Sequence, residues 1–247
     1  MNTPDNQHAC LVIGAAGGIG RALLPRLAAA GWNLVLAGRR EQPLTELAAE
    51  LDATTAVLDA TDFSAVADLF KQHAPITAAV NLAGSIILKP AHATSPQDFD
   101  DTVAQNLRTA FALVRAAGQG MRATGGSVVL MSTCAASFGL PNHELIAAAK
   151  AGVEGLVRAA AATYASNNLR FNAVAPGLVD TPLAQRITAN EASLRASIAM
   201  HPLGRIGAPD DIARCIAFLL DPESNWITGQ ILGADGGLAR VLARPRG

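Results

Sequence analysis

The sequence has few aromatic residues, few cysteines and a single tyrosine. Aromatic residues make up 4% of the 247 residues, and the three cysteines are Cys10, Cys134 and Cys215. Their odd number and wide spacing argue against a disulfide framework. Cys134 is better explained as a small apolar residue than as a reactive thiol. A reducing compartment, the cytoplasm, is therefore expected.

The sequence also lacks a charge excess, a long hydrophobic run and a metal-binding pattern. Lysine and arginine number 19 against 20 acidic residues, and the basic residues do not cluster, so neither nucleic acid nor an anionic membrane is an expected partner. Apolar runs such as Ala159–Ala162 and Ile216–Leu220 are too short to cross a bilayer, and the N-terminus does not resemble a signal peptide. Four histidines show no spacing typical of metal ligands: His8, His73, His92 and His201. No metal site is expected.

Short hydrophobic runs alternate with amphipathic segments along the chain. The runs expected to be strands are Ala9–Ile13, Asn33–Ala37, Ala53–Leu58, Ala78–Leu82, Ser127–Met131, Leu169–Val174 and Gln230–Leu232. Helical patterns lie near residues 18–30, 41–51, 63–73, 97–123, 144–165 and 209–220. This alternation predicts an α/β fold of Rossmann type, a doubly wound parallel sheet of seven strands with helices on both faces.

No linker or repeat divides the sequence, and half of its residues are hydrophobic. We therefore expect one domain over residues 1–247 with a substantial core. Val179–Gly207 is the one long stretch without a clear strand, and prolines follow Thr181 and His201 near its ends. This pattern predicts a substrate lid over the sheet at about residues 179–207.

A glycine-rich turn follows the first expected strand. It reads Gly14-Ala-Ala-Gly17-Gly18-Ile19-Gly20 and leads directly into the first expected helix. Glycines at such a turn let backbone N–H groups approach a pyrophosphate at the positive end of the helix. A glycine-rich stretch can also be a simple tight turn, but the order of strand, turn and helix favours a dinucleotide site.

The end of the second expected strand bears on which dinucleotide binds. NAD-specific sites place a carboxylate there, which accepts hydrogen bonds from the ribose hydroxyls and repels a 2′-phosphate. This sequence has Gly38 at that position, followed by Arg39 and Arg40, and no acidic residue at the strand end. A guanidinium can bind the 2′-phosphate through paired charge-assisted hydrogen bonds, unless the two arginines only begin a solvated helix. We predict NADP(H) rather than NAD(H), bound chiefly by Arg39.

The glycine spacing resembles that of the short-chain dehydrogenase/reductase family, and further motifs of that family follow in order. The resemblance implies that Asp59, with Ala60 beside it, contacts the adenine, and that Asn106 holds a water near the catalytic lysine. It also implies that the turn Asn81-Leu82-Ala83-Gly84 binds the cofactor, although the family has a second asparagine where this chain has Leu82. The stretch expected around the nicotinamide carboxamide contains Pro176, Gly177, Val179, Thr181 and Leu183, and the tail motif is Asp235-Gly-Gly237.

The resemblance fails at the residue that normally transfers the proton. Family members carry a tyrosine four residues before the catalytic lysine, and this chain has Ile146 four residues before Lys150. In the family this lysine binds the nicotinamide ribose and lowers the pKa of the tyrosine. Here it is expected to keep only the first role, because the tyrosine is absent. Thr133 stands where the family usually has serine and is expected to bond a substrate oxygen. The neighbouring Ser132 is expected to face the other side of its strand, so it could replace Thr133 only where a bulge shifts the register.

His143 is the candidate replacement for the tyrosine. It lies seven residues before Lys150 on the same expected helix face as Ile146. Enoyl-acyl carrier protein reductases of this family use a tyrosine at that spacing, and Pro141-Asn-His143 resembles their Pro-Asn-Tyr. Dienoyl-CoA reductases also lack the usual tyrosine. An exposed histidine at a helix start explains the residue equally well.

Three functions remain compatible with these residues. The first is an NADPH-dependent reductase of a carbonyl or a conjugated alkene, whose proton comes from His143, a water near Asn106 or the solvent. The second is an NADP(H)-binding sensor or partner subunit without turnover. The third is a lyase or isomerase on the same scaffold. Retention of Lys150 and Asn106 favours the first.

The expected partners are a small apolar substrate and further copies of the chain. No basic cluster indicates a carboxylate or CoA phosphate, and the expected pocket residues are Leu140, Leu145, Ile146, Leu183 and Ile187. The resemblance implies a homo-oligomer, a tetramer, paired through the helices that match residues 97–123 and 144–165. The small residues Ala159–Ala162 would permit close helix approach, although they also suit a tightly packed core.

Overall fold

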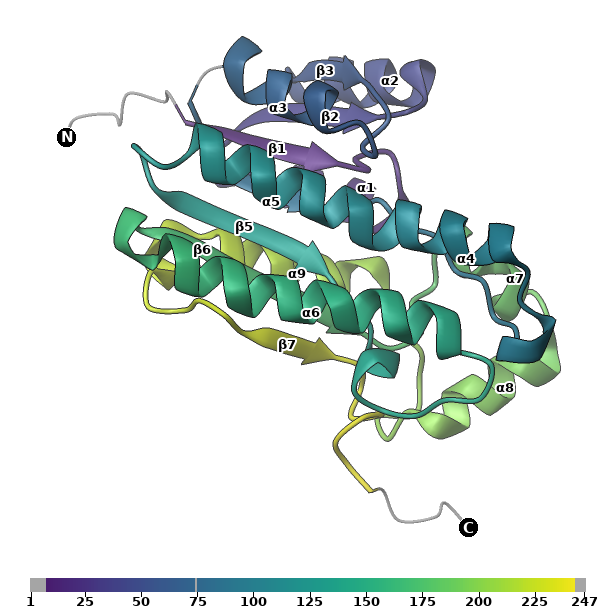
Figure 1. Ribbon diagram of the computed structural model, residues 1–247. Coiled ribbons are helices and arrows are strands. Elements are labelled where there is room, and N and C mark those ends of the chain that lie inside the picture. Colours follow the sequence, from purple (N-terminus) through teal and green to yellow (C-terminus); the bar gives the residue numbers. More distant parts are fainter. Residues whose placement is uncertain (1–7, 74, 243–247) are drawn as a thin grey trace.

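Within the described residues of the computed structural model, 8–73 and 75–242, seven parallel strands form one sheet (Figure 1). The strands are β1 (Ala9–Ile13), β2 (Asn33–Gly38), β3 (Thr54–Val57), β4 (Ile76–Asn81), β5 (Gly126–Met131), β6 (Leu169–Pro176) and β7 (Ile231–Ala234). Their order is β3-β2-β1-β4-β5-β6-β7, so the chain begins in the middle of the sheet and winds to one edge and then to the other. The predicted Rossmann-type fold is confirmed.

Helices cover both faces of the sheet. They are α1 (Gly18–Ala29), α2 (Glu41–Leu51), α3 (Phe63–Gln72), α4 (Pro96–Val103), α5 (Thr109–Gly120), α6 (Glu144–Tyr164), α7 (Gln185–Thr188), α8 (Glu191–Met200) and α9 (Pro209–Leu220). Helices α3, α5 and α6 share one hydrophobic cluster with the strands, and α1, α2 and α9 share the other. The sheet is thus buried on both faces, as its nearly continuous apolar strands require.

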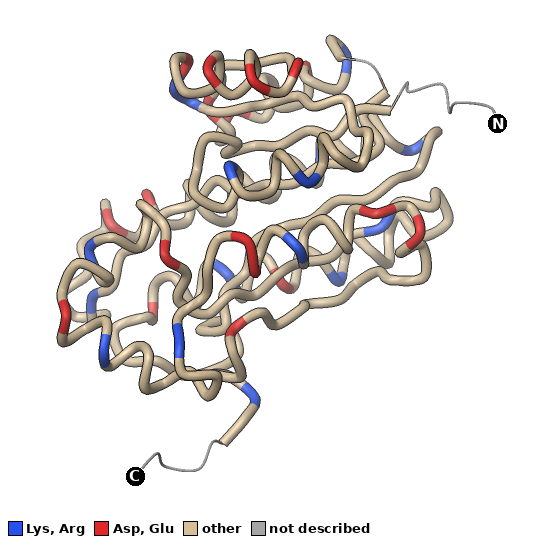
Figure 2. Tube along the Cα trace, turned by 180° about the vertical axis from the view of Figure 1, so that it is seen from behind, with Lys and Arg blue, Asp and Glu red and all other residues tan. Residues whose placement is uncertain are grey.

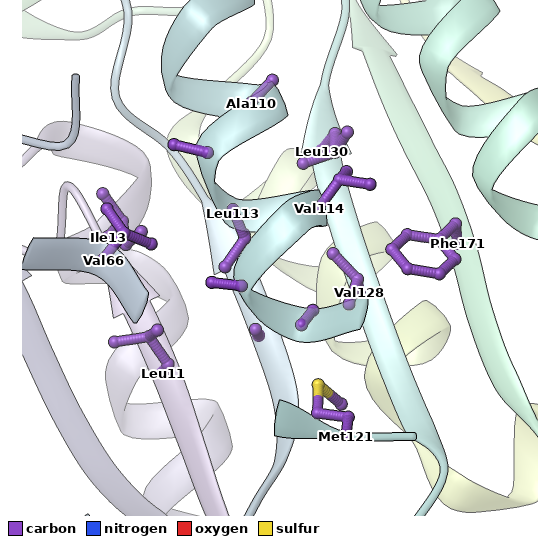
Figure 3. Packing of buried hydrophobic residues seen from close by; sticks show 14 of the residues in the cluster. Leu11, Ile13, Val66, Ala110, Leu113, Val114, Met121, Val128, Leu130 and Phe171 are labelled. Atoms are coloured by element: carbon purple, nitrogen blue, oxygen red, sulfur yellow. The ribbon is translucent and has the colours of Figure 1, made fainter. Parts of the chain in front are cut away.

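Alternate residues of each strand supply the two hydrophobic clusters. Figure 3 shows Val128 and Leu130 of β5 packed between Leu113 of α5 and Phe171 of β6. The intervening Val129 belongs to the cluster on the opposite face. All five side chains are fully buried. This period of two fixes which strand residues face each helical layer.

The pattern predicted as one helix near residues 97–123 contains a π-helical turn. The turn covers Ala104–Arg108 and joins α4 to α5 without a break. Asn106 lies in it and is buried. A π-turn widens the helix by one residue, and such turns occur frequently at functional sites.

Residues 179–207 form a helical segment beyond the carboxyl ends of the strands. The segment contains α7 and α8, which lie past the arrowheads of β5 and β7 (Figure 1). Its two ends are joined by a parallel bridge between Val179 and Gly207, with the Asp180 N–H donating to the Gly207 carbonyl at 2.9 Å. Ligands of open α/β sheets bind at this edge.

Charged residues of both signs are scattered along the described chain (Figure 2). No helix in the ranges 8–73 and 75–242 has the length and hydropathy needed to span a membrane. Within those ranges, no group of three or more His, Cys, Asp or Glu residues is arranged to hold a metal ion.

Candidate functional site

The glycine-rich turn is packed too closely for side chains. Gly14 has φ +81°, and a Cβ built on it would lie 2.9 Å from the Ala83 nitrogen. A Cβ on Gly20 would overlap the carbonyl oxygen of Ala15. The turn opens onto α1, whose first turn carries no acidic residue and whose N-cap, Gly17, provides no side-chain cap. The first N–H groups of a helix have no intrahelical partners, so this turn fits a pyrophosphate.

The end of β2 brings Arg39 close to Asp59. Arg39 and Arg40 are exposed directly after Gly38, and Arg40 is the N-cap of α2. The backbone N–H of Thr61, then its side chain, holds the pKa of Asp59 below its usual value, and the nearby Arg39 adds to this effect. Two residues predicted separately to bind the adenosine end of a dinucleotide therefore lie together.

The turn after β4 lies against Asn106 and Lys150. Asn81 anchors the turn because its side chain donates to Thr109 at 3.1 Å and accepts from the Ala83 N–H at 3.0 Å. A Cβ on Gly84 would lie 2.9 Å from Asn106 Oδ1 and 3.7 Å from Lys150 Nζ. An alanine at Gly84 would therefore displace the Asn106 side chain and come into van der Waals contact with Lys150.

Asn106 is fixed by its own hydrogen bonds. Its Nδ2 donates to the carbonyl of Thr102 at 3.0 Å, and to the carbonyl and hydroxyl of Ser85 at 3.3 and 3.1 Å. The side chain thus joins the π-turn to the loop after β4. Ser85, which has no motif of its own, was not predicted.

Lys150 is buried and bonded to the end of β5. Its Nζ donates to the Met131 carbonyl at 2.8 Å. Burial lowers the pKa of Lys150 from 10.5 to about 8. The folded protein therefore makes the charged ammonium costly unless an anion or a further acceptor approaches it.

Replacing Lys150 by methionine should raise the free energy of unfolding at neutral pH. The fall in pKa from 10.5 to about 8 corresponds to a cost of about 3 kcal/mol for the charged form, and the lost bond to Met131 offsets about 1 kcal/mol of the gain. Between pH 8 and 10.5 the unfolded chain keeps a proton that the folded chain has released, so wild-type stability rises with pH there. The advantage of Lys150→Met should shrink across that window. Denaturant unfolding at neutral and alkaline pH measures this, and a wild type as stable as the variant at neutral pH would contradict it.

Two neighbouring residues at the end of β5 have different roles. Ser132 donates to the buried carboxylate of Glu154 at 2.8 Å, so its hydroxyl is bound to α6. Thr133 begins the 3-10 turn Cys134–Ala136, where its Oγ1 accepts from the Ala135 N–H at 3.4 Å. Ser132 is thus unsuited to replace Thr133 as a donor to substrate. Glu154 was not predicted, because a glutamate one turn after a lysine usually indicates a solvated helix face.

His143 stands at the N-terminus of α6 with one ring nitrogen fixed. Its Nδ1 lies 2.8 Å from the Pro141 carbonyl, which can only accept, so Nδ1 carries a proton. The same ring lines the cavity that Ile146 and Lys150 line. Nε2 is left to take up or give a proton.

The candidate catalytic residues and those expected around the nicotinamide line one mostly apolar cavity of about 240 Å³, here called the central cavity. The glycines of the first turn, Arg39, Arg40, Asp59, Ala60 and Asn81 lie outside its lining. Its walls include Ile19, Ala83, Gly84, Asn106, Thr133, Leu140, His143, Ile146, Lys150, Pro176, Gly177, Val179, Thr181, Leu183 and Ile187. Residues of the 179–207 segment that no motif indicated also line it, namely Ala184, Ser197, Met200 and His201. Cys134 lines it as well, and burial raises the pKa of its thiol to about 11, which fits an unreactive residue.

One predicted pocket residue is misplaced. Leu145 is buried but does not line the central cavity, whereas Ile146 does. Successive residues of a helix point about 100° apart, so only one of the two can face the cavity. Tyr164 lies at the far end of α6, with its ring 5.6 Å from that of Phe171, and serves the core.

A family model described as "Enoyl-(Acyl carrier protein) reductase" matches residues 14–239. The chain is 31% identical to a 3-oxoacyl-(acyl-carrier-protein) reductase of Thermotoga maritima over 93% of this chain and 96% of that protein. The chain belongs to the short-chain dehydrogenase/reductase family. It is an oxidoreductase of that family, and it is also 35% identical to a 2-keto-3-deoxy-L-fuconate dehydrogenase of Xanthomonas campestris, over 96% of this chain and 81% of that protein.

Solved structures agree with this assignment. A protein of Agrobacterium tumefaciens, provisionally assigned as a gluconate dehydrogenase, superposes with a TM-score of 0.90 at 28% identity and covers 95% of this chain and 97% of its own. A protein of Beutenbergia cavernae, provisionally assigned as an NAD(P)-dependent gluconate 5-dehydrogenase and holding NADP at low occupancy, superposes with a TM-score of 0.88 at 30% identity, covering 94% of this chain and 96% of its own.

Proposed function

We propose that this short-chain dehydrogenase/reductase is an NADP(H)-dependent enzyme that reduces a carbonyl or a conjugated enoyl group without the family's usual tyrosine. The observation that carries the proposal is the convergence of Thr133, His143 and Lys150 on one cavity, with the apolar Ile146 in its wall. A hydroxyl, an imidazole and an amine are groups that reductions of this kind use.

The cofactor assignment is supported by the site and by a relative. The glycine turn has no space for side chains and opens onto the N-terminus of α1, which has no side-chain cap. Gly38 stands where NAD-specific sites place a carboxylate, and Arg39 follows it. The Beutenbergia cavernae relative holds NADP. Bound NADPH would supply a hydride from its nicotinamide. Lys150 and the stretch from Pro176 to Leu183 would hold the nicotinamide end.

The proton then has to come from the chain or from water. Thr133 would donate to a substrate oxygen, and Lys150 would hold the ribose. His143, with Nδ1 bonded to Pro141, would give a proton from Nε2. The apolar walls exclude water, and 179–207 would act as the lid over the substrate.

The substrate class follows from the lining and the relatives. The relatives named above act on keto or hydroxy compounds by their names, and the matching family model is named for enoyl reduction. A mostly apolar cavity favours an acyl or other hydrophobic ketone over a sugar acid. Loss of NADPH absorbance with a panel of hydrophobic ketones and enoyl thioesters tests the proposal. NADPH binding without oxidation by any member of the panel would overturn it.

A second candidate function rests on Ile146. The side chain is buried in the cavity wall and has no proton to exchange. The chain would then bind NADP(H) as a sensor or as the partner of an active subunit, or carry out a lyase or isomerase reaction. Tight NADPH binding that changes the oligomeric state, without turnover, would favour a sensor.

Arg39→Ala should weaken NADPH binding about 10- to 100-fold and leave NADH binding nearly unchanged. The reason is that a charge-assisted hydrogen bond to the 2′-phosphate contributes about 1.5–3 kcal/mol, and NADH has no such phosphate. Titration of both cofactors measures the two Kd values. Arg40→Ala is the matched control and should have the smaller effect. Wild-type protein that binds NADH as tightly as NADPH would refute the assignment.

We also expect a tetramer, with an outer face of α6 at an interface. Ala148, Ala151, Gly155, Ala159 and Ala162 are exposed along one side of that helix and would let a second helix approach closely. Light scattering should give about four times the mass of one chain, 25.3 kDa. Ala159→Glu should give a smaller species because it places charge in the contact. A single-chain mass for the wild type at micromolar concentration would contradict this expectation.

A further inference from the structure

His201 is almost completely buried at the end of α8. Only 3% of its surface is exposed, and it lines both the central cavity and a second hollow of about 400 Å³. The second hollow is bounded on its other side by Leu203 and by the tail Asp235–Gly237. The imidazole therefore forms a wall between two cavities, and none of the roles proposed above uses it.

Both ring nitrogens of His201 have backbone partners. Nδ1 lies 2.6 Å from the Ser197 carbonyl oxygen, one turn earlier in α8, and Nε2 lies 3.3 Å from the backbone nitrogen of Leu178. A carbonyl can only accept, and a backbone N–H can only donate. Both bonds therefore require a neutral imidazole with its proton on Nδ1. A second proton, on Nε2, would remove the acceptor of the Leu178 N–H.

The Nε2 side of the ring faces the turn that follows β6. Gly177 packs directly on the ring, because a Cβ built there would lie 2.5 Å from His201 Nε2. On its other side, the turn is bonded to the end of the 179–207 segment, where the Gly207 N–H donates to the Leu178 carbonyl at 2.8 Å. Leu178 is thus held between Gly207 and His201.

We propose that His201 is a positioning residue that couples α8 to the turn Pro176–Leu178 through its neutral imidazole. When the acceptor at Nε2 is lost, the Leu178 N–H has no partner, and α8 is released from the turn. Ser197 and Met200 of α8 line the central cavity, so its shape changes with that release. The inference rests on the proposed function only in placing this turn beside the nicotinamide.

Charged and titratable groups near His201 come from several elements. They are His143 before α6, Lys150 of α6, Cys134 after β5, Asp235 after β7, Arg205 before α9, Asp211 of α9, and Glu191 and Arg195 of α8 itself. Arg205 pairs with Asp211 at 2.6 Å and Arg195 pairs with Glu191 at 3.0 Å, so the opposite charges of each pair neutralise one another. None of these groups in the described chain is hydrogen-bonded to the imidazole. The imidazole is hydrogen-bonded instead to the backbone at Ser197 and Leu178.

Hydrogen exchange of the cofactor-free protein tests the coupling without a substrate. Glutamine reaches to the position of Nε2 and can accept from Leu178, whereas asparagine reaches only to that of Nδ1. His201→Asn should speed exchange of the Leu178 amide about fivefold, the effect of one net hydrogen bond, and should also speed exchange in α8. His201→Gln should keep the wild-type protection. The same substitution at a distant site, His73→Asn, is the matched control and should not change the protection of Leu178.

The pH dependence of hydrogen exchange provides a second test, which can be made on the wild-type protein. After correction for intrinsic exchange rates, wild-type Leu178 should lose protection on acidification, because a proton on Nε2 removes the acceptor of its N–H, and His201→Gln should not. Equal protection in wild type and His201→Asn would overturn the proposal. So would an equal loss in the glutamine and asparagine variants, or a pH response that His201→Gln retains. Because no turnover is measured, these outcomes are independent of whether the chain reduces ketones or enoyl thioesters.

Discussion

His143→Ala is expected to lower kcat by about 10²–10⁴-fold, the range that a positioned general acid contributes. The variant removes a ring that lines the central cavity, whose Nδ1 is bonded to Pro141 and whose Nε2 is the proposed proton donor. NADPH affinity should stay near the wild-type value, because the proposed contacts of the nucleotide, the glycine turn and Arg39, are elsewhere. A fall in kcat without a fall in cofactor affinity assigns the residue to proton transfer.

The experiment has a control that separates proton transfer from packing. Added imidazole should restore part of the lost rate in His143→Ala, since the vacated space adjoins the central cavity, and His73→Ala should neither lose activity nor respond. Because a general acid acts only when protonated, the fall of kcat toward high pH that it causes should disappear in His143→Ala. An unchanged rate with an unchanged pH profile would remove His143 from the mechanism and leave a water near Asn106, or bulk solvent, as the proton source.

The sequence was sufficient to predict the strands of the sheet, because buried parallel strands are continuous apolar runs. Each expected strand is present, with ends that differ by at most two residues. The last expected run, Gln230–Leu232, is an example, since β7 extends to Ala234 because pairing with β6 continues there. The glycine turn could also be predicted from the sequence. Close packing at Gly14 and Gly20 excludes any side chain, so glycine has to stand at these two positions.

The sequence did not predict the contacts that join segments distant along the chain. His201 meets Leu178 and Gly177 only after the 179–207 segment closes on itself, and no local pattern indicates that contact. Ser132 and Glu154 likewise pair across 22 positions. Leu145 and Ile146 are both apolar and adjacent, so periodicity alone did not say which of them faces the cavity. Tertiary packing decides each of these cases.

Ile146→Tyr should raise the reduction of small hydrophobic ketones by about 10²-fold or more, the lower end of what a positioned acid contributes. Ile146 lies one turn before Lys150 and lines the central cavity, so a phenol there would enter the same space as Thr133 and the amine. Lys150 would stabilise the phenolate, because an ammonium beside a phenol lowers its pKa. Asn106 and Lys150 are already held in place by hydrogen bonds to Ser85 and Met131, respectively.

The larger ring brings a packing cost that has to be measured separately. Ile146 is 5% exposed, and enlarging a buried residue typically costs about 1–3 kcal/mol. Ile146→Phe fills the same space without a hydroxyl and is therefore the matched control, with thermal unfolding used to compare the two. Ketone reduction that is faster in Ile146→Tyr than in both Ile146→Phe and wild type supports the expectation, and equal rates in the two aromatic variants contradict it. If wild type reduces no substrate and Ile146→Tyr gains activity, the chain has kept the binding site and lost its proton donor. Only that donor would then separate this chain from an active reductase. Cofactor binding without turnover would therefore become the better account of its function.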